Sequence, residues 1–257
     1  PGAAGTTAPA GAGTAPNAAA EQPASQLYAD TAAALAATPR VAIDTPALKG
    51  SINLEGARLD YLQLRNYHET IDKNSPIITL LSPASAQGAY FAEQGWVSTD
   101  GTAKVPTSST LWKLEGGNTL TPSTPVTLTY DNGEGLVFTR TIAVDDHYLF
   151  TVSQSVQNNS GKPVSLYAYA RAVRNGTPNV QNFFVLHEGP VGILTSKNLV
   201  TLKYGDLQKD QQVDATSDGG WLGFTDKYWA TAVMPEPKTP VNARFSWSKP
   251  ASLDVYQ

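Results

Sequence analysis

From Arg40 onward, the chain is a succession of short apolar runs of period two, each ending at a cluster of Gly, Asn, Asp, Ser or Pro. This alternation is typical of strands that bury one face, and the intervening residues are those that turns require. The clearest stretch predicts four strands of an antiparallel meander, over 126–130, 136–144, 147–157 and 163–173. Turns at 131–135, 145–146 and 158–161 separate them.

The side chains of these segments divide between two faces, because neighbouring residues of a strand point in opposite directions. Over 136–144 one face combines Arg140 with four apolar side chains, those of Leu136, Phe138, Ile142 and Val144. Further strands are predicted over 51–54, 58–64, 77–81, 182–187, 191–195, 199–204, 221–225, 228–234 and 241–247. No long segment has helical periodicity, and no internal repeat is found. The pattern therefore predicts an all-β protein, with two packed, mostly antiparallel sheets or a barrel.

The first 26 residues contain no Val, Ile, Leu, Met or aromatic side chain, and Glu21 is their only charge. Such a segment cannot bury enough apolar surface to offset its conformational entropy. Residues 27–38 favour a short helix that would fray, and Pro39 ends it. We therefore expect a disordered linker over 1–38 and one folded domain over 39–257. Because the chain starts at Pro1 without Met or a signal peptide, we expect it to be cut from a longer protein.

Composition argues against several classes of partner. The formal net charge is −4, with 18 Lys and Arg against 22 Asp and Glu, and no basic cluster is present. Nucleic acids and anionic lipid headgroups are therefore not expected as partners. No apolar run approaches the ~20 residues of a membrane-spanning helix. The chain has no Cys, so its cysteine content does not indicate a redox compartment.

Residues that could support catalysis are few. The three His residues, at 68, 147 and 187, do not lie at metal-ligand spacing from one another. Asp145, Asp146 and His147 are interpreted as a turn between two strands. No nucleophile elbow and no phosphate-binding glycine motif occurs. The sequence therefore predicts no catalytic residue, no cofactor site and no metal site.

An alternative remains open, namely a carbohydrate-binding or aldose-epimerase-like protein. That function needs a Glu base and a His acid within hydrogen-bond reach of one substrate. The candidates are Glu188 with His187, and Glu93 with His68.

The five Trp residues divide into two groups. Trp221, Trp229 and Trp247 lie in predicted strands, and we expect them in the core. Trp96 and Trp112 flank a loop rich in Gly, Thr and Ser, and are the better candidates for residues that line a cleft.

Several segments resemble one known family. Residues 219–235 (GGWLGFTDKYWATAVMP) and 52–70 (INLEGARLDYLQLRNYHET) resemble the periplasmic domain of the YidC family of bacterial membrane protein insertases, in its alphaproteobacterial form. Residues 75–83, 126–152, 158–178 and 185–194 follow in the family's order. The resemblance covers about residues 40–249.

This resemblance implies a β-supersandwich of the galactose-mutarotase-like type on the periplasmic side of the bacterial inner membrane. It implies a non-catalytic interaction domain that docks the Sec translocon accessory subunits SecD and SecF, through a segment equivalent to 174–218. Nascent inner-membrane proteins would engage the membrane portion of such an insertase. Family domains continue past the equivalent of Gln257, so we expect truncation there and an open edge strand at the C-terminus.

Overall fold

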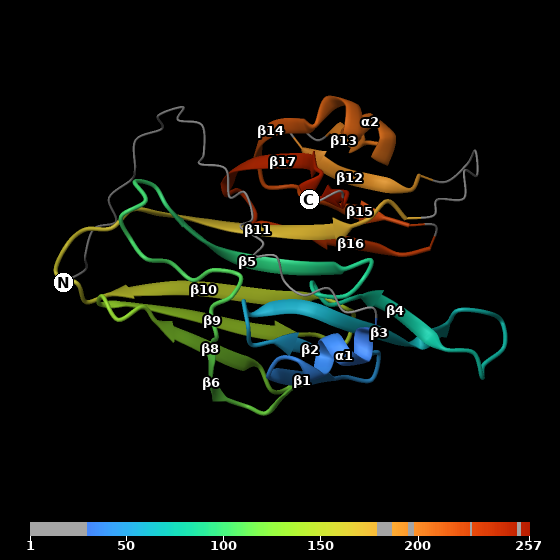
Figure 1. Cartoon of the computed structure of the whole chain (residues 1–257), viewed down its shortest axis with the longest axis horizontal. Coiled ribbons are helices and arrows are strands. Elements are labelled where there is room, and N and C mark those ends of the chain that lie inside the picture. The colour runs from blue at the N-terminus through green and yellow to red at the C-terminus, as the bar shows by residue number, and fades with distance from the viewer. Residues whose placement is uncertain (1–29, 179–186, 195–197, 227, 251–252) are drawn as a thin grey trace.

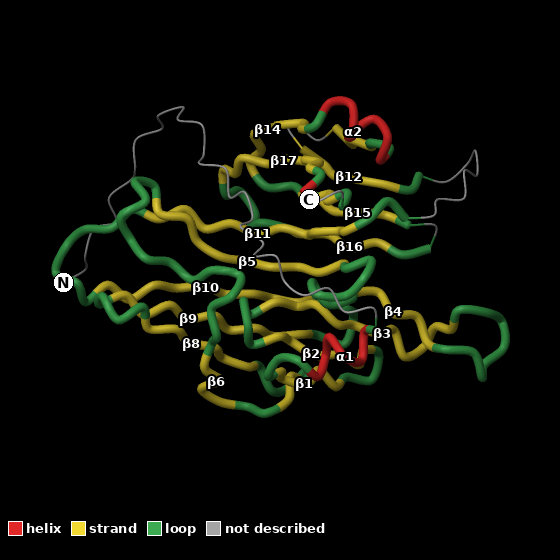
Figure 2. Tube along the Cα trace, in the orientation of Figure 1, coloured by secondary structure: helices red, strands yellow, loops and turns green. Residues whose placement is uncertain are grey.

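The computed structural model describes residues 30–178, 187–194, 198–226, 228–250 and 253–257. Almost all regular structure in this part of the chain is β-strand, as expected, and Figure 2 shows how little of it is helical. The two described helices are α1 (Thr31–Ala36) and α2 (Tyr204–Asp210). The strands form three sheets, and their packing confirms the predicted all-β sandwich.

The largest sheet has ten strands. Its main path runs through β14 (Gln212–Asp218), β17 (Pro240–Ser248), β18 (Val255–Tyr256), β11 (Leu166–Asn175), β5 (Tyr90–Ser98), β3 (Arg58–His68), β2 (Leu48–Asn53), β1 (Arg40–Asp44) and β7 (Thr119–Leu120). The tenth strand, β4 (Ile77–Leu81), pairs with β3 outside this path. All of these pairs are antiparallel except that of β1 with β7.

Two four-stranded sheets complete the fold. The first, which we call the meander sheet, has the order β10 (Phe150–Asn158), β9 (Leu136–Val144), β8 (Val126–Asp131), β6 (Lys113–Gly116). The second, which we call the small sheet, has the order β13 (Asn198–Thr201), β12 (Gly189–Leu194), β15 (Trp221–Thr225), β16 (Ala230–Val233). Figure 1 shows the meander sheet in the lower half of the molecule and the small sheet in the upper half.

Both four-stranded sheets pack on the same face of the ten-stranded sheet. Tyr90 and Trp96 are an even number of residues apart on β5, so their side chains share a face. Trp96 packs on Phe138 of the meander sheet, with 5.0 Å between the ring centroids. Tyr90 meets Phe224 of the small sheet edge-to-face at 6.0 Å. One continuous hydrophobic cluster, to which these four aromatic residues belong, joins the three sheets.

The predicted alternation of 136–144 is confirmed by β9, which has the same bounds. Every second residue is buried, and Arg140 lies on the buried face. The turn before β9 contains Gly133 and Gly135 at φ 74° and 89°, a conformation that glycine adopts without steric cost. The strands predicted over 77–81 and 221–225 are also found with the same bounds, as β4 and β15.

The predicted four-stranded meander is wrong in its last member. β8, β9 and β10 pair in sequence, but β11 crosses to the ten-stranded sheet and pairs with β5. Alternation along 163–173 fits either partner, and contacts across the β5–β11 pair distinguish them: Arg171 of β11 binds Glu93, its direct partner on β5. As a result, β10 lies at the edge of the meander sheet.

The C-terminal segment also differs from expectation. The sequence predicted an open edge strand at the C-terminus, but β18 lies between β11 and β17 and pairs with both. Near the other end, α1 is formed inside the segment expected to be linker. Asp30 caps it by accepting a hydrogen bond from the backbone N–H of Ala32 at 2.9 Å, and Ala34 is buried.

Some strands were not predicted, and two predicted segments lie wholly or partly outside the described residues. β1, β5, β6, β7, β14 and β18 were missed because they are short or mix polar residues into both faces. The predicted strand over 199–204 is divided between β13 and the start of α2. Residues 182–186 of the strand predicted over 182–187 lie outside the described residues, and so does the linker over 1–29.

Candidate docking surface

The small sheet carries a row of apolar side chains across its strands. Leu199 of β13 pairs with Ile193 of β12, and Ile193 pairs in turn with Trp221 of β15. Leu222 pairs with Val233, so Met234 stands next to the end of β16, opposite Trp221. Directly opposed residues of an antiparallel ladder lie on the same face. We call this set the apolar row, namely Leu199, Ile193, Trp221 and Met234.

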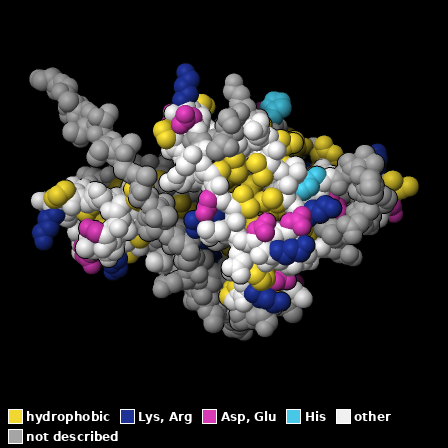
Figure 3. Space-filling model, turned by 90° about the horizontal axis from the view of Figure 1, so that it is seen from above, with side chains coloured by type: hydrophobic (Ala, Val, Ile, Leu, Met, Phe, Trp, Pro, Cys, Tyr) yellow, Lys and Arg dark blue, Asp and Glu magenta, His cyan; other side chains and the backbone are white. Residues whose placement is uncertain are grey.

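The apolar row lies on the face of the small sheet that points away from the core. The opposite face supplies Leu194 and Phe224 to the hydrophobic cluster, and Val200, Leu222 and Val233 pack against that cluster. None of the four residues of the row belongs to it. Leu199 is 61% exposed and Met234 is 56% exposed, while Ile193 and Trp221 are half-buried. Figure 3 shows hydrophobic side chains gathered on the surface seen from above.

An ion pair and aromatic contacts fix the small sheet to the ten-stranded sheet. Arg174 at the end of β11 donates from Nη1 to both carboxylate oxygens of Asp226, at 2.7 and 2.8 Å. Its guanidinium also lies over the ring of Tyr90, 4.8 Å from the centroid. Tyr204 of α2 stacks on Phe224. Burial raises the pKa of the Tyr204 hydroxyl and raises that of Tyr90 to about 12, so both stay neutral.

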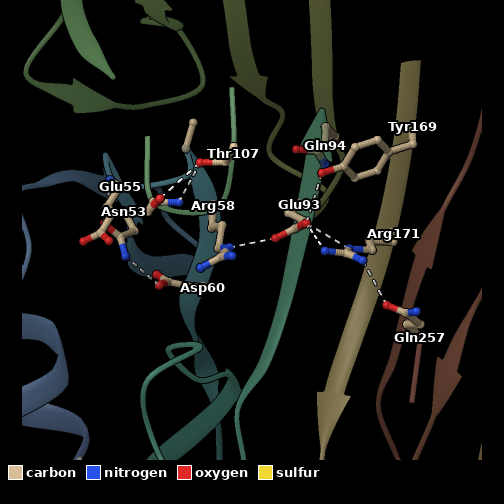
Figure 4. A network of polar contacts seen from close by, with 12 residues as sticks. Asn53, Glu55, Arg58, Asp60, Glu93, Gln94, Thr107, Tyr169, Arg171 and Gln257 are labelled. Carbon is tan, nitrogen blue, oxygen red and sulfur yellow. Dashed lines mark hydrogen bonds and ion pairs between the residues drawn. The ribbon is translucent and has the colours of Figure 1, made fainter. Parts of the chain in front are cut away.

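A buried charge network occupies the ten-stranded sheet, centred on Glu93 (Figure 4). Arg58 Nε donates to Oε2 at 2.7 Å, Arg171 Nε donates to Oε1 at 2.9 Å, and the Tyr169 hydroxyl donates to Oε1 at 3.3 Å. Arg171 Nη1 continues to the side-chain oxygen of Gln257 at 3.0 Å. Burial alone would raise the pKa of Glu93, but the guanidiniums of Arg171 and Arg58 hold it below its ordinary value. Glu93 is thus an ionised structural carboxylate that joins β3, β5 and β11.

A second buried acid lies beside this network. Asp60 pairs with Arg40 and accepts a hydrogen bond from the Asn53 amide at 3.3 Å. Burial raises the pKa of Asp60, although Arg40 acts in the opposite direction. The pair links β1 to β3.

Arg140 ties the meander sheet to the ten-stranded sheet. Its guanidinium donates to the carbonyl of Ala57 at 2.8 Å, to the carbonyl of Gln94 at 2.5 Å and to the side chain of Gln154 at 3.0 Å. It also lies over the rings of Trp112 and Trp96, at 4.9 and 5.7 Å. Burial lowers the pKa of Arg140 to about 10, which leaves it charged at neutral pH. Its contacts are backbone, amide and aromatic groups, so it serves packing and not acid–base chemistry.

The structure does not bring together Glu93 and His68, one of the two acid–base pairs proposed for a sugar-processing site. Glu93 neighbours the start of β3, where Leu59 pairs with Ala92, and His68 ends the same strand. Nine residues of strand separate Leu59 from His68 by roughly 30 Å. His68 Nδ1 instead contacts the carbonyl of Ser75 at 2.7 Å.

The other candidate residues also make local contacts. His187 Nε2 contacts the carbonyl of Pro190 at 3.0 Å. The Asp145 carboxylate accepts the backbone N–H groups of His147 and Leu149 at 2.7 and 2.8 Å, and these bonds lower its pKa. The predicted turn at Asp145 is confirmed. Within the described ranges, no three His, Asp or Glu side chains converge as a metal site requires.

The prediction for the Trp residues is wrong for Trp96, Trp112 and Trp221, whereas Trp229 and Trp247 pack against the core cluster as expected. Trp96 and Trp112, the candidates for a cleft, are buried and stack on each other at 6.3 Å. Trp221, expected in the core, lies on the outer face of the small sheet, while Trp229 and Trp247 pack at the margin of the core. The local sequence was misleading because the two Trp residues lie at opposite ends of a Gly-, Thr- and Ser-rich loop. This loop folds back, so that Trp112 stacks on Trp96 inside the protein. The register that exposes Trp221 is set by tertiary pairing.

The fold and its surface define an all-β sandwich domain with an exposed apolar row. The family described as YidC periplasmic domain matches residues 40–257, and this chain belongs to that family. It is 51% identical over 225 residues to the membrane protein insertase YidC of Nitrobacter hamburgensis, covering 87% of this chain and 37% of that protein. For the YidC proteins of Rhizobium etli and Mesorhizobium japonicum, identity is 53% over 213 residues and 50% over 245.

These matches confirm the family resemblance derived from the sequence motifs. They cover 83% and 95% of this chain for the Rhizobium and Mesorhizobium proteins, but only 36% and 40% of those proteins. The chain therefore spans well under half the length of the relatives it matches. Among the described residues, neither helix is long and apolar enough to cross a bilayer.

Proposed function

We propose that this domain serves a membrane protein insertase as a non-catalytic docking platform on the periplasmic side of the bacterial inner membrane. In this proposal it binds the Sec translocon accessory subunits SecD and SecF, and so supports the insertion and folding of inner-membrane proteins. Nascent chains would engage the remainder of the insertase, beyond the matched domain. The relatives are named as insertases, and the family as a periplasmic domain, which supports this placement.

The observation that carries the proposal is the apolar row. The segment expected to contact SecD and SecF, residues 174–218, contributes β12, β13, α2 and β14. Two residues of the row, Ile193 and Leu199, lie inside this segment, and Trp221 and Met234 extend the row beyond it. Protein interfaces use aromatic and Met side chains as central contacts and avoid charge at their core. The row meets this description.

The test is a pull-down of SecD and SecF with the full-length insertase that contains this domain. The double variant Leu199→Ser, Met234→Ser removes the two most exposed members of the row. Because loss of a central apolar contact typically costs 1–3 kcal/mol of binding, we expect SecD and SecF recovery to fall by roughly tenfold or more.

The matched control is Leu111→Ser, since Leu111 is also 61% exposed but lies before β6, outside the small sheet. We expect it to retain wild-type recovery. Unchanged recovery with the double variant, at wild-type thermal stability, would show that the row is not the docking surface.

A further inference from the structure

β10 presents one unpaired edge. It ends the meander sheet, and among the described strands its nine residues pair with β9 alone, in a register that runs without a bulge from Phe150 to Asn158. Within the described ranges, no backbone hydrogen bond reaches β10 from another strand. In an antiparallel strand, alternate residues direct N–H and C=O groups to either side. About half of the backbone groups of β10 therefore face away from β9 without a strand partner.

This edge lacks the features by which proteins usually prevent strand addition. β10 has the sequence FTVSQSVQN, with no charged residue, no Pro and no Gly. Natural edge strands are commonly short, bulged or charged. The other described edges follow that rule. β6 is four residues long, with a register shift and two charges, β7 has two residues, β13 and β16 have four, and β14 carries Asp214. β4, which pairs with β3 outside the main path, is uncharged but has five residues and a ladder interrupted by two register shifts. The unprotected edge of β10 is therefore an exception that calls for a function.

Part of the ten-stranded sheet, around Ala168 and Ala170 of β11, extends beyond the edge of β10. We call this part the shelf. Ala168 of β11 pairs with Trp96, and Ala170 pairs with Gln94, so both alanines lie on the face that the meander sheet covers elsewhere. Both are nevertheless exposed. Arg140 Nη2 donates both to the carbonyl of Gln94 on β5 and to the side chain of Gln154 on β10, which places β10 close to β5, as Figure 1 also shows. The shelf is thus bordered by the backbone of β10, and its surface, which we call its floor, is formed by the small side chains of Ala168 and Ala170.

We propose that the free edge of β10 binds an extended segment of another polypeptide by β-augmentation, with the segment lying over the shelf at Ala168 and Ala170. The chemistry is specific for an extended backbone, since unpaired N–H and C=O groups at strand spacing are complementary to another strand. The inward residues Phe150, Val152 and Val156 pack against the core. The outward residues Thr151 and Ser153 are polar and exposed.

The bound segment therefore alternates apolar residues toward the shelf with polar residues toward solvent. A single strand fits the shelf better than a second copy of the chain. Paired strands lie about 4.8 Å apart, whereas a second copy would have to place its own meander sheet over the same floor. This site lies on a different sheet from the apolar row and does not depend on SecD or SecF binding.

The test uses the 257-residue chain and a fluorescent peptide of nine alternating Val and Thr residues, with a dilysine tail for solubility. Fluorescence anisotropy measures binding, and amide hydrogen exchange locates it. We expect saturable binding with slower exchange of alternate amides of β10. The control peptide has the same side chains but N-methyl groups at alternate positions, which remove its donors. We expect its affinity to be weaker by roughly tenfold or more, because the ladder cannot form.

Two variants of the chain locate the site. Ala170→Glu places a charge on the floor of the shelf, and should weaken peptide binding by roughly tenfold without unfolding an already exposed position. Ala232→Glu is the matched control, since Ala232 is an exposed Ala on β16 of the small sheet, and it should bind as wild type does.

Equal binding of the two peptides, or protection confined to the small sheet, would overturn the proposal. Concentration-dependent dimerisation that is abolished by Val156→Lys, without peptide binding, would also overturn it in favour of a second copy. Because SecD and SecF are absent from this experiment, its failure leaves the docking proposal unaffected.

Discussion

The meander sheet and the small sheet have the same number of strands and lie on the same face of the ten-stranded sheet, but their outer faces differ. Hydroxyl side chains are common among the outward residues of the meander sheet, with Thr127 opposite Thr141 at 3.1 Å between hydroxyl oxygens, and Thr151 exposed on β10. The outer face of the small sheet carries the apolar row. The outer face of the meander sheet is thus polar and suited to solvent, while the outer face of the small sheet presents an apolar surface typical of a binding face.

The two sheets are also attached differently. The meander sheet is held by Arg140, which is 1% exposed and makes its hydrogen bonds to backbone and amide oxygens. The small sheet is held by the Arg174–Asp226 ion pair, in which the Asp226 side chain is 28% exposed. Water screens the second contact more than the first. We expect the attachment of the small sheet to be the weaker of the two.

Removing Arg140 should have the largest effect on stability. Arg140→Ala leaves the carbonyls of Ala57 and Gln94 without their donor and opens a cavity between Trp96 and Trp112. We expect a loss of about 3–5 kcal/mol in the free energy of unfolding, measured by urea denaturation. Arg140→Lys should recover only part of it, because an ammonium cannot span both carbonyls as the planar guanidinium does. A loss below about 1 kcal/mol for Arg140→Ala would contradict this role.

The next effect depends on pH. Because Arg171 and Arg58 lower the pKa of Glu93 below 4.5, its contribution is fully present above about pH 4.5 and is lost as the pH falls through the folded-state value. Glu93→Gln should cost about 2–4 kcal/mol at neutral pH, since it leaves two buried guanidiniums without a carboxylate. The difference between variant and wild type should shrink in acid, as urea midpoints at several pH values will show. A difference independent of pH would refute this assignment.

A smaller and local effect is expected at the small sheet. Asp226→Asn removes the charge that Arg174 binds, and should cost about 1–2 kcal/mol. Amide hydrogen exchange should become faster in β15 and β16, while β9 keeps wild-type protection. Equal acceleration in both sheets would show that they do not unfold separately.

The smallest effect separates binding from stability. Leu199→Ser should change the free energy of unfolding by less than about 0.5 kcal/mol, because the side chain is exposed and outside the core cluster. The same substitution should weaken the partner interaction proposed for the apolar row. A large loss of stability would instead assign Leu199 to the core.

The sequence predicted individual strands better than their partners. The bounds of β4, β9 and β15 and the position of Arg140 on the apolar face of β9 followed from alternation and turn residues, which act over a few neighbours. The partner of β11 could not be predicted, because its alternation fits β10 and β5 alike. Trp96 and Trp112 were misjudged for the same reason, since their stacking joins separate strands. The family, by contrast, was evident from the order of motifs and is confirmed over residues 40–257.

The sequence by itself determined that this protein is built from strands, where several of them begin and end, and which family it belongs to. These properties depend on local periodicity, turn chemistry and motif order. Only the tertiary structure decided that β11 leaves the meander, that β10 is the edge strand of its sheet among the described residues, and that Leu199, Ile193 and Trp221 align across three strands. The physical reason is that register and sheet order are set by contacts between residues far apart in the chain, such as Arg171 with Glu93 and Arg140 with Ala57.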